Sequence, residues 1–278
     1  MLTDLHSVAQ SCAADGTGLG AFNVIHLENA RTFTRAAEES ERPVVLQISQ
    51  NAVKYHDGML EPIALGTLSV AKAADVPVIV HLDHAEDEEL CRRAIDLGFT
   101  SVMYDGSHLP DDANREATAR IVECAHAAGV SVEAELGEVG GKNGVHDPSA
   151  RTDPGDAAQF VADTGVDLLA VAVGSSHAMT TRGAELDFAL ITALRDAVPV
   201  PLVLHGSSGV SDDGMQAAIR AGMTKINVST HLNKVFTGTV REYLAEHPDV
   251  VDSRRWFAPA TAAQEAEVAR LLRLYAEA

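Results

Sequence analysis

The chain has 278 residues, of which 46% are hydrophobic and 22% charged, so it can bury the core of a large globular domain and is too apolar for a disordered protein. Its 40 Asp and Glu residues against 21 Lys and Arg give a formal net charge of −19, which disfavours binding to nucleic acid and to anionic membranes. No apolar stretch is long enough to span a membrane, and Cys12, Cys91 and Cys124 follow no metal or redox spacing, so we expect a protein of the reducing cytoplasm.

Short β-branched runs alternate with longer segments of helical period along the whole chain. We predict strands at 20–24, 44–49, 76–82, 101–104, 130–136, 168–173, 201–205 and 224–228. We predict helices at 27–41, 60–74, 86–97, 110–128, 155–164, 187–197, 212–221 and 231–246. The strands are nearly continuous apolar runs, which is typical of parallel strands covered on both faces. Eight successive strand–helix units predict an α/β protein that forms a closed (β/α)8 TIM barrel.

Two helices are expected in addition to the eightfold set. A helix at 2–14 would cover the floor of the barrel, and a helix at about 260–276 would follow the last unit. No linker or change of composition divides the chain, so we predict a single domain over residues 1–278. The one long connection without a predicted element is 137–153. Ser211 is predicted to begin a helix as its N-cap, and three glycines are predicted to end helices: Gly98, Gly129 and Gly222.

Polar residues follow every predicted strand, at the barrel end where TIM-barrel chemistry is found. In chain order the strand ends carry Asn23, Ser49, Asp83–His84, Asp105, Glu133 with Glu135, Gly174–His177, His205–Ser208 and Asn227–Thr230. The opposite ends of the strands carry no comparable cluster. The sequence therefore predicts a site at the carboxyl ends of the strands.

Three of these residues are histidines: His84, His177 and His205. Each alone is typical of a hydrogen-bonded structural histidine. Together, at one barrel mouth and beside several carboxylates, they favour a metal, because three protein ligands with an open fourth position are typical of catalytic zinc. The carboxylates would orient these ligands or hold a second metal position. His81, inside the third strand, is predicted to lie behind the ligands.

The ends of the last two strands predict a phosphate pocket. Gly206-Ser207-Ser208-Gly209 offers backbone N–H groups and hydroxyls, and Asn227–Thr230 opens the last helix of the barrel, whose N-terminus favours an anion. The alternative is an ordinary turn and helix cap, which use the same residue types. Two such segments on adjacent strands favour the phosphate pocket.

These residues stand in motifs that resemble the class II, zinc-dependent fructose-bisphosphate/tagatose-bisphosphate aldolase family. The motifs are GAFNVIHLENA (20–30), HLDHAED (81–87), SVMYDGSH (101–108), VEAELGEVGG (132–141), AVAVGSSHA (170–178), LVLHGSSGV (202–210) and TKINVST (224–230). The resemblance extends over about residues 1–257, with the motifs in the family's order. It is more specific for the family than for the substrate.

The resemblance implies a role for each matching residue. His84, His177 and His205 would bind the catalytic Zn²⁺, and Asp83 would be the acid/base at the C4 oxygen of the substrate. Asp105 and Glu135 match residues that can hold a second metal position. The substrate-binding positions implied in the same way are Asn23, Ser49, Ala178, Gly206, Ser207, Ser208, Asn227, Val228, Ser229 and Thr230. Ser49 would contact the phosphate on the aldehyde side.

The sequence departs from the family in three places. Ala178 replaces a glycine whose backbone helps to coordinate a monovalent cation (Na⁺ or K⁺), so that site is weakened if it exists here. Gly140-Gly141 is followed by Lys142-Asn143-Gly144 instead of acidic residues, which leaves the base for the C3 proton unassigned. The nearest candidates are Glu138, His146 and Asp147. The tail after 252 lacks the family's Gly/Ser-rich end.

The predicted function is reversible cleavage of a phosphorylated ketose into dihydroxyacetone phosphate and an aldehyde such as glyceraldehyde 3-phosphate, through a zinc-stabilised enediolate. Fructose and tagatose 1,6-bisphosphate are the leading substrates, with deoxy or sulfonated sugar phosphates as alternatives. A second alternative is an aldolase-like accessory or binding subunit with weak turnover. A lysine imine mechanism is disfavoured because none of the five lysines is placed for it: Lys225 begins the last predicted strand, at the wrong end for the site. The others lie in predicted helices (Lys72 and Lys234) or loops (Lys54 and Lys142). By resemblance we expect a homodimer or homotetramer.

Overall fold

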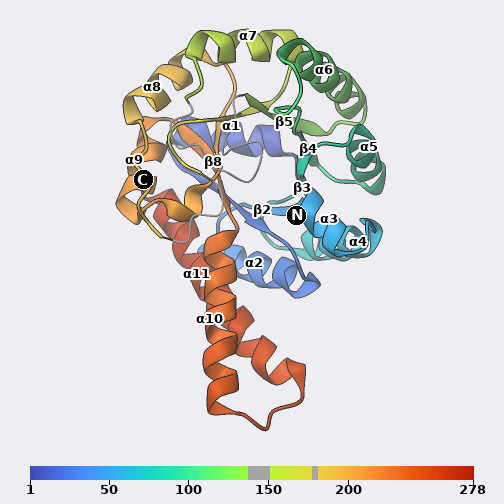
Figure 1. Ribbon diagram of the computed structural model, residues 1–278, viewed down its shortest axis with the longest axis vertical. Coiled ribbons are helices and arrows are strands. Elements are labelled where there is room, and N and C mark those ends of the chain that lie inside the picture. The colour runs from blue at the N-terminus through green and yellow to red at the C-terminus, as the bar shows by residue number, and fades with distance from the viewer. Residues whose placement is uncertain (137–150, 177–180) are drawn as a thin grey trace.

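The computed structural model describes residues 1–136, 151–176 and 181–278, and within them eight parallel strands close into one barrel (Figure 1). The strands are β1 (Leu19–Asn23), β2 (Val44–Ser49), β3 (Val78–Ala85), β4 (Ser101–Tyr104), β5 (Ser131–Leu136), β6 (Leu168–Val171), β7 (Leu202–Leu204) and β8 (Met223–Val228). They pair in chain order, and β8 closes on β1. The predicted (β/α)8 TIM barrel is therefore confirmed.

Most of the helices surround the barrel, as Figure 1 shows. They are α1 (Leu5–Asp15), α2 (Leu27–Ser40), α3 (Gln50–Tyr55), α4 (Glu61–Ala73), α5 (Glu88–Leu97), α6 (Asp111–Ala127), α7 (Pro154–Thr164), α8 (Phe188–Ala197), α9 (Asp212–Ala221), α10 (Thr230–Glu246) and α11 (Ser253–Ala276), with a 3-10 turn η1 at Ser207–Gly209. The predicted N-cap Ser211 is confirmed, because its side chain accepts a hydrogen bond from the Gly214 N–H. Gly98 ends α5 in a left-handed conformation, also as predicted. The short α3 was not predicted.

The extra helix α1 closes the floor of the barrel, as expected. Leu5, Ala9 and Cys12 are buried on one side of it and form a cluster with strand residues that point into the barrel, such as Leu19 and Ile79. A larger cluster fills the space between the outer faces of the strands and the surrounding helices. Apolar side chains thus fill much of the lower barrel, next to α1.

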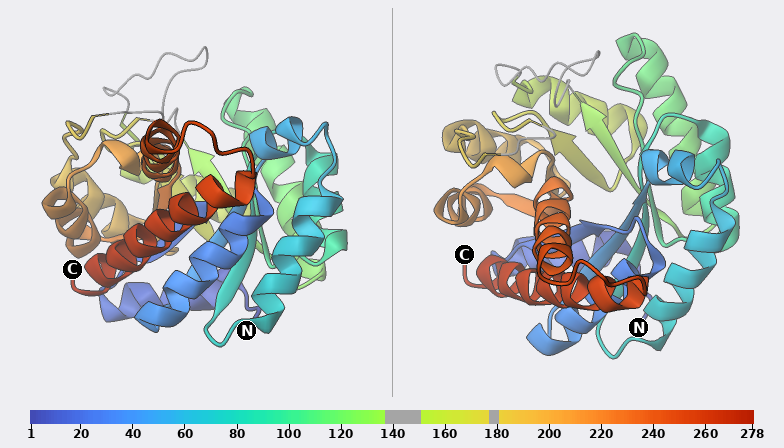
Figure 2. Two further views of the ribbon diagram at one scale, coloured as in Figure 1. Left: turned by 90° about the horizontal axis from the view of Figure 1, so that it is seen from below. Right: turned by 60° about the horizontal axis from the view of Figure 1, so that its bottom comes forward.

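Helices α10 and α11 form an arm that projects from the barrel (Figure 1). The arm leads away from the top of β8 along α10, turns, and returns along α11, which then runs beside α2 (Figure 2). The carboxyl end of α11 packs into the body of the protein, where Tyr275 is buried and its carbonyl accepts a hydrogen bond from the Gly18 N–H. In the described part of the chain, no helix has the length and apolar character needed to cross a bilayer.

Candidate active site

A cavity of about 400 Å³ opens at the carboxyl ends of the strands. The predicted site residues that line it are Asn23, Ser49, Asp83, His84, Asp105, Gly206, Ser207, Ser208, Asn227, Ser229 and Thr230. Glu135 and His205 are buried, and Val228 is a buried residue of β8. His177 and Ala178 lie outside the described residues, as do Glu138, His146 and Asp147. The structure thus brings strand ends that are far apart in the sequence to one cavity.

An irregularity in β3 places two consecutive residues in this cavity. Neighbouring residues of a regular strand point to opposite faces. Here the pairing of β3 with β4 shifts register between Leu82 and Ala85, and His84 has a φ of +48°, a left-handed conformation that is uncommon outside glycine. Asp83 and His84 therefore both line the cavity. Ser49 pairs with Asp83 across β2 and β3 and is the N-cap of α3.

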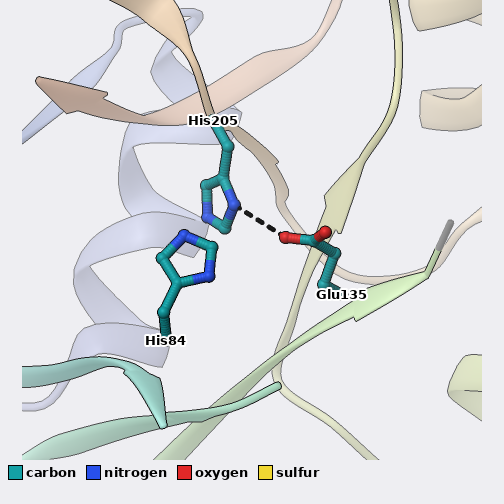
Figure 3. Close-up of side chains that lie close together, drawn as sticks. All are labelled: His84, Glu135 and His205. Atoms are coloured by element: carbon teal, nitrogen blue, oxygen red, sulfur yellow. Dashed lines mark hydrogen bonds and ion pairs between the residues drawn. The ribbon is translucent and has the colours of Figure 1, made fainter. Parts of the chain in front are cut away.

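Two imidazoles and a carboxylate meet at the side of this cavity. His84, Glu135 and His205 each offer a ligand atom, and these atoms lie within 4.8 Å of one another (Figure 3). The Nδ1 atom of His205 lies 3.0 Å from Oε2 of Glu135, and the two imidazole rings are 4.6 Å apart between centroids. Asp105 holds His84 through a 2.9 Å contact between its Oδ2 and Nδ1. Imidazole and carboxylate groups in this arrangement suit a divalent transition metal such as zinc.

The close carboxylates and imidazoles of the site shift one another's pKa values. Burial opposes protonation of His84, but Asp83 and the hydrogen bond with Asp105 outweigh it and raise the pKa of His84 to about 10. Burial likewise opposes ionisation of Asp83, yet His84 lowers the pKa of this carboxyl below its ordinary value. The pKa of His205 is raised in the same way, against burial, by hydrogen bonds with Glu133 and Glu135. A bound divalent cation would replace these protons as the positive charge among the carboxylates.

Asp83 is held by amide groups on both sides. Its Oδ2 accepts a hydrogen bond of 3.1 Å from Nδ2 of Asn23, and its Oδ1 accepts one of 3.3 Å from Nδ2 of Asn227. The Oδ1 atom of Asn23 in turn accepts a hydrogen bond of 2.8 Å from Nε2 of Gln47. These contacts fix the carboxylate and leave it as a hydrogen-bond acceptor, as a group that takes up a proton requires.

Backbone N–H groups gather on the other side of the cavity, after β7 and β8. Gly206 has a φ of +67° and leads into η1, whose Ser207 hydroxyl donates to the carbonyl of Asn227. The Ser208 hydroxyl accepts a hydrogen bond of 3.1 Å from the His231 N–H in the first turn of α10. Ser229 is the N-cap of α10 but makes no side-chain cap hydrogen bond. The first turn of this 17-residue helix therefore presents N–H groups and a positive dipole end to the cavity, which suits a phosphate.

Sequence reasoning assigned no site role to three residues near this site, Gln47, Lys225 and Lys54. Gln47 is a buried polar residue of the apolar β2, and Lys225 is fully buried on β8 with its ammonium 2.8 Å from Glu133, a residue already predicted at the end of β5. Lys54, on the unpredicted α3, lines the cavity. A polar residue inside an apolar strand was the available signal for Gln47 and Lys225. His81, predicted to lie behind the ligands, is buried there, and burial together with Lys225 lowers its pKa to about 3.

Comparison with known proteins identifies relatives over almost the whole chain. The family model described as fructose-bisphosphate aldolase class-II matches residues 3–278. A fructose-bisphosphate aldolase of Geobacillus stearothermophilus is 42% identical over 253 residues, which cover 90% of this chain and 88% of that protein. One of Giardia intestinalis is 39% identical over 268 residues, covering 87% and 83%.

A solved structure is similar in its fold. The crystal structure of the YdjI aldolase from Escherichia coli K12 superposes with a TM-score of 0.87 and 32% sequence identity, covering 99% of this chain and 97% of that one.

Proposed function

The chain belongs to the class II fructose-bisphosphate aldolase family, and we propose that it cleaves fructose 1,6-bisphosphate reversibly into dihydroxyacetone phosphate and glyceraldehyde 3-phosphate. As a member of this family it is a carbon–carbon lyase. The observation that supports the substrate proposal is the shared cavity. It is lined by the fixed Asp83 carboxylate, by the turn at Gly206–Ser208 and by His84, whose ring belongs to the candidate metal cluster with the buried Glu135 and His205. Tagatose 1,6-bisphosphate, which differs only at C4, is the second substrate to test.

The metal in this proposal is Zn²⁺, held by His84, His177 and His205, with Asp105 and Glu135 serving a second position. The grouping of His84, Glu135 and His205 supports it, because these donors suit zinc. When bound, the ion supplies a Lewis acid for the negative charge that develops as the C3–C4 bond breaks. We include a Na⁺ or K⁺ ion beside Ala178 in the proposal only because the motif at 170–178 resembles that of the family.

Asp83 is the group proposed to take the proton from the C4 hydroxyl in cleavage and to return it in synthesis. Its lowered pKa keeps it ionised near neutral pH, and the Asn23 and Asn227 amides fix the direction of its free lone pairs. Gly206–Ser208 and the first turn of α10 would hold the phosphate of the dihydroxyacetone half. Fixing this phosphate aligns the scissile bond with Asp83, which removes the entropy cost of orientation from the chemical step.

The second phosphate would bind beside α3. Ser49 and Lys54 both line the cavity there, and Lys54 is the one Lys or Arg among the described residues that do so. The other charged lining residues include Asp83, Glu86 and Asp105, so an anion on this side needs a local cation. A bisphosphate fits this distribution of charge better than a monophosphate does.

Cleavage assays on a panel of ketose phosphates test the function. We expect fructose 1,6-bisphosphate to give the highest kcat/KM, loss of activity with a chelator, recovery with Zn²⁺, and no inactivation by borohydride in the presence of substrate. A higher kcat/KM for tagatose 1,6-bisphosphate, or for a deoxy or sulfonated sugar phosphate, would show that this sugar is the substrate in place of fructose 1,6-bisphosphate. Activity at background on the whole panel would refute the enzyme proposal in favour of a binding subunit.

The proposal includes a homodimer or homotetramer that works in the reducing cytoplasm. The arm of α10 and α11 supports the assembly: Leu232 is the only residue of α10 that is fully buried in this chain, and Val251 at the turn of the arm is 95% exposed. The three free cysteines are compatible with a reducing compartment. Sedimentation equilibrium tests the assembly, and a monomer at micromolar concentration would contradict it.

A further inference from the structure

Lys225 lies beneath the cavity with its side chain completely shielded from solvent. Its Nζ atom is 2.8 Å from Oε2 of Glu133 on β5 and donates a hydrogen bond of 2.7 Å to Oδ1 of Asn227, two residues further along β8. Glu133 is also completely shielded. Burying a charge costs free energy unless an opposite charge lies close by. Lys225 and Glu133 each provide that partner for the other, so both side chains are held in place.

On the Asn227 side, the ammonium determines which way the amide faces. An ammonium group can only donate hydrogen bonds, so the amide must turn its oxygen toward Lys225. The amide nitrogen is then directed to the opposite side, where it donates to Oδ1 of Asp83. Without Lys225 the two ends of the Asn227 amide could exchange places, and an amide oxygen would then face the Asp83 carboxylate.

On the Glu133 side, the same ammonium contacts a carboxylate that adjoins the candidate metal cluster of His84, Glu135 and His205. The second oxygen of Glu133, Oε1, lies 3.0 Å from Nε2 of His205, whose Nδ1 faces Glu135. A carboxylate that receives the N–H of a histidine fixes the tautomer and the ring orientation, so that the other nitrogen can bind a metal. Lys225 thereby fixes the carboxylate that orients His205.

We propose that Lys225 is a positioning residue that orients, from beneath the cavity, both the acid/base Asp83 through Asn227 and the metal ligand His205 through Glu133. The chemical roles of Asp83 and His205 in this statement rest on the proposed function. The arrangement itself rests on the contacts of one buried ammonium with two groups that serve different parts of the site.

The second amide that holds Asp83 provides a matched comparison. Asn23 is oriented by Gln47 in the way that Asn227 is oriented by Lys225. Within the described residues, however, the Gln47 side chain makes no hydrogen bond to the candidate metal cluster of His84, Glu135 and His205. The informative variants are therefore Lys225→Met and Gln47→Leu, which remove one orienting donor each. Lys72→Met, on the exposed side of α4, controls for the loss of one positive charge.

Two quantities are measured on each purified variant: the affinity for Zn²⁺ by competition with a chelator, and kcat with fructose 1,6-bisphosphate at saturating Zn²⁺. We expect Lys225→Met to lose about tenfold to 100-fold in Zn²⁺ affinity, the range typical of lost outer-shell support, and to lose kcat as well. Gln47→Leu should lose kcat with Zn²⁺ affinity within about twofold of wild type. Lys72→Met should change neither.

A purely structural Lys225 would give a different pattern. A lower melting temperature for Lys225→Met, with Zn²⁺ affinity and kcat per folded molecule unchanged, would overturn the proposal. If wild type cleaves no ketose phosphate, the proposed function fails, while the Zn²⁺ affinities of Lys225→Met and Gln47→Leu still decide the positioning role.

A double variant covers the case in which Lys225→Met does not fold. Lys225→Met with Glu133→Gln leaves no unpaired buried charge, so it should fold and still have reduced kcat, because Asn227 is not oriented. Recovery of both Zn²⁺ affinity and kcat to wild-type values in this double variant would overturn the proposal. Failure of the double variant to fold would also overturn it, because the pair of Lys225 and Glu133 would then be required by the core itself.

Discussion

The turn at Gly206 offers a prediction whose size follows from the coordinates. A Cβ atom at this position would lie 2.5 Å from the carbonyl carbon of Ser176 and 2.6 Å from its oxygen. Carbon atoms in contact are ordinarily separated by about 3.5–4.0 Å, so Gly206→Ala must move the loops after β6 and β7 apart by about 1 Å. A misplacement of that size can cost about 100-fold in rate. We therefore expect kcat/KM for fructose 1,6-bisphosphate to fall about 100-fold.

The matched control for this variant is Gly129→Ala. Gly129 has a φ of +72°, close to the +67° of Gly206, but no atom lies within 4 Å of its added Cβ. Both variants place alanine in the left-handed conformation, at a cost of about 1–2 kcal/mol in unfolding free energy. Only Gly206→Ala should lose activity, measured as release of dihydroxyacetone phosphate. A kcat/KM for Gly206→Ala within threefold of that for Gly129→Ala would refute the reasoning.

Four further predictions concern the charged residues of the site. Asp83→Ala should abolish cleavage and retain bound zinc, whereas His84→Ala should lose zinc by elemental analysis; unchanged turnover in the first or full zinc content in the second would contradict the assigned roles. Lys54→Met should lower kcat/KM about tenfold for fructose 1,6-bisphosphate, as expected for one exposed charge-assisted contact, and leave fructose 1-phosphate unaffected; equal losses on both substrates would remove Lys54 from the second phosphate site. In metal-free protein, the pKa of His84 is raised from 6.5 to about 10, so the stability that its protonated form contributes is fully present below pH 6.5 and is lost as the pH rises to about 10. Urea unfolding should show a steeper decline in wild type than in His84→Asn, in which His205 still contributes, and parallel pH profiles of the two would contradict it.

Periodicity and position were sufficient to predict the barrel and the end of it that carries the site. Apolar runs gave the parallel strands, and polar residues directly after them gave Asp83, His84 and Asp105 as residues of one cavity. The bulge in β3 was not predictable, because the polar residues DHAED that follow the predicted strand end at 82 are typical of a loop. In the structure β3 continues to Ala85, and the bulge turns two consecutive side chains to the same cavity.

The other differences between the predicted and the observed structure come from the length of one side chain and from the ends and lengths of two helices. Lys225 was placed at the wrong end of β8 from its backbone position, but its extended side chain reaches the underside of the cavity. Helix α11 begins at Ser253, earlier than the predicted start at 260, because Asp252 caps it and Pro259 is accommodated inside the helix. Helix α3, with six residues, is too short to show a helical period.

The bulge in β3 also limits how this site can be redesigned. Asp83 and His84 are adjacent in the chain and depend on one register shift, so an insertion, a deletion or a straightened strand would displace the proton-transfer group and the metal ligand together. Directed evolution toward another metal or a longer sugar should therefore find tolerated changes on β4, α3 and the start of α10. We expect β3 to be the segment in which libraries yield almost no active clones.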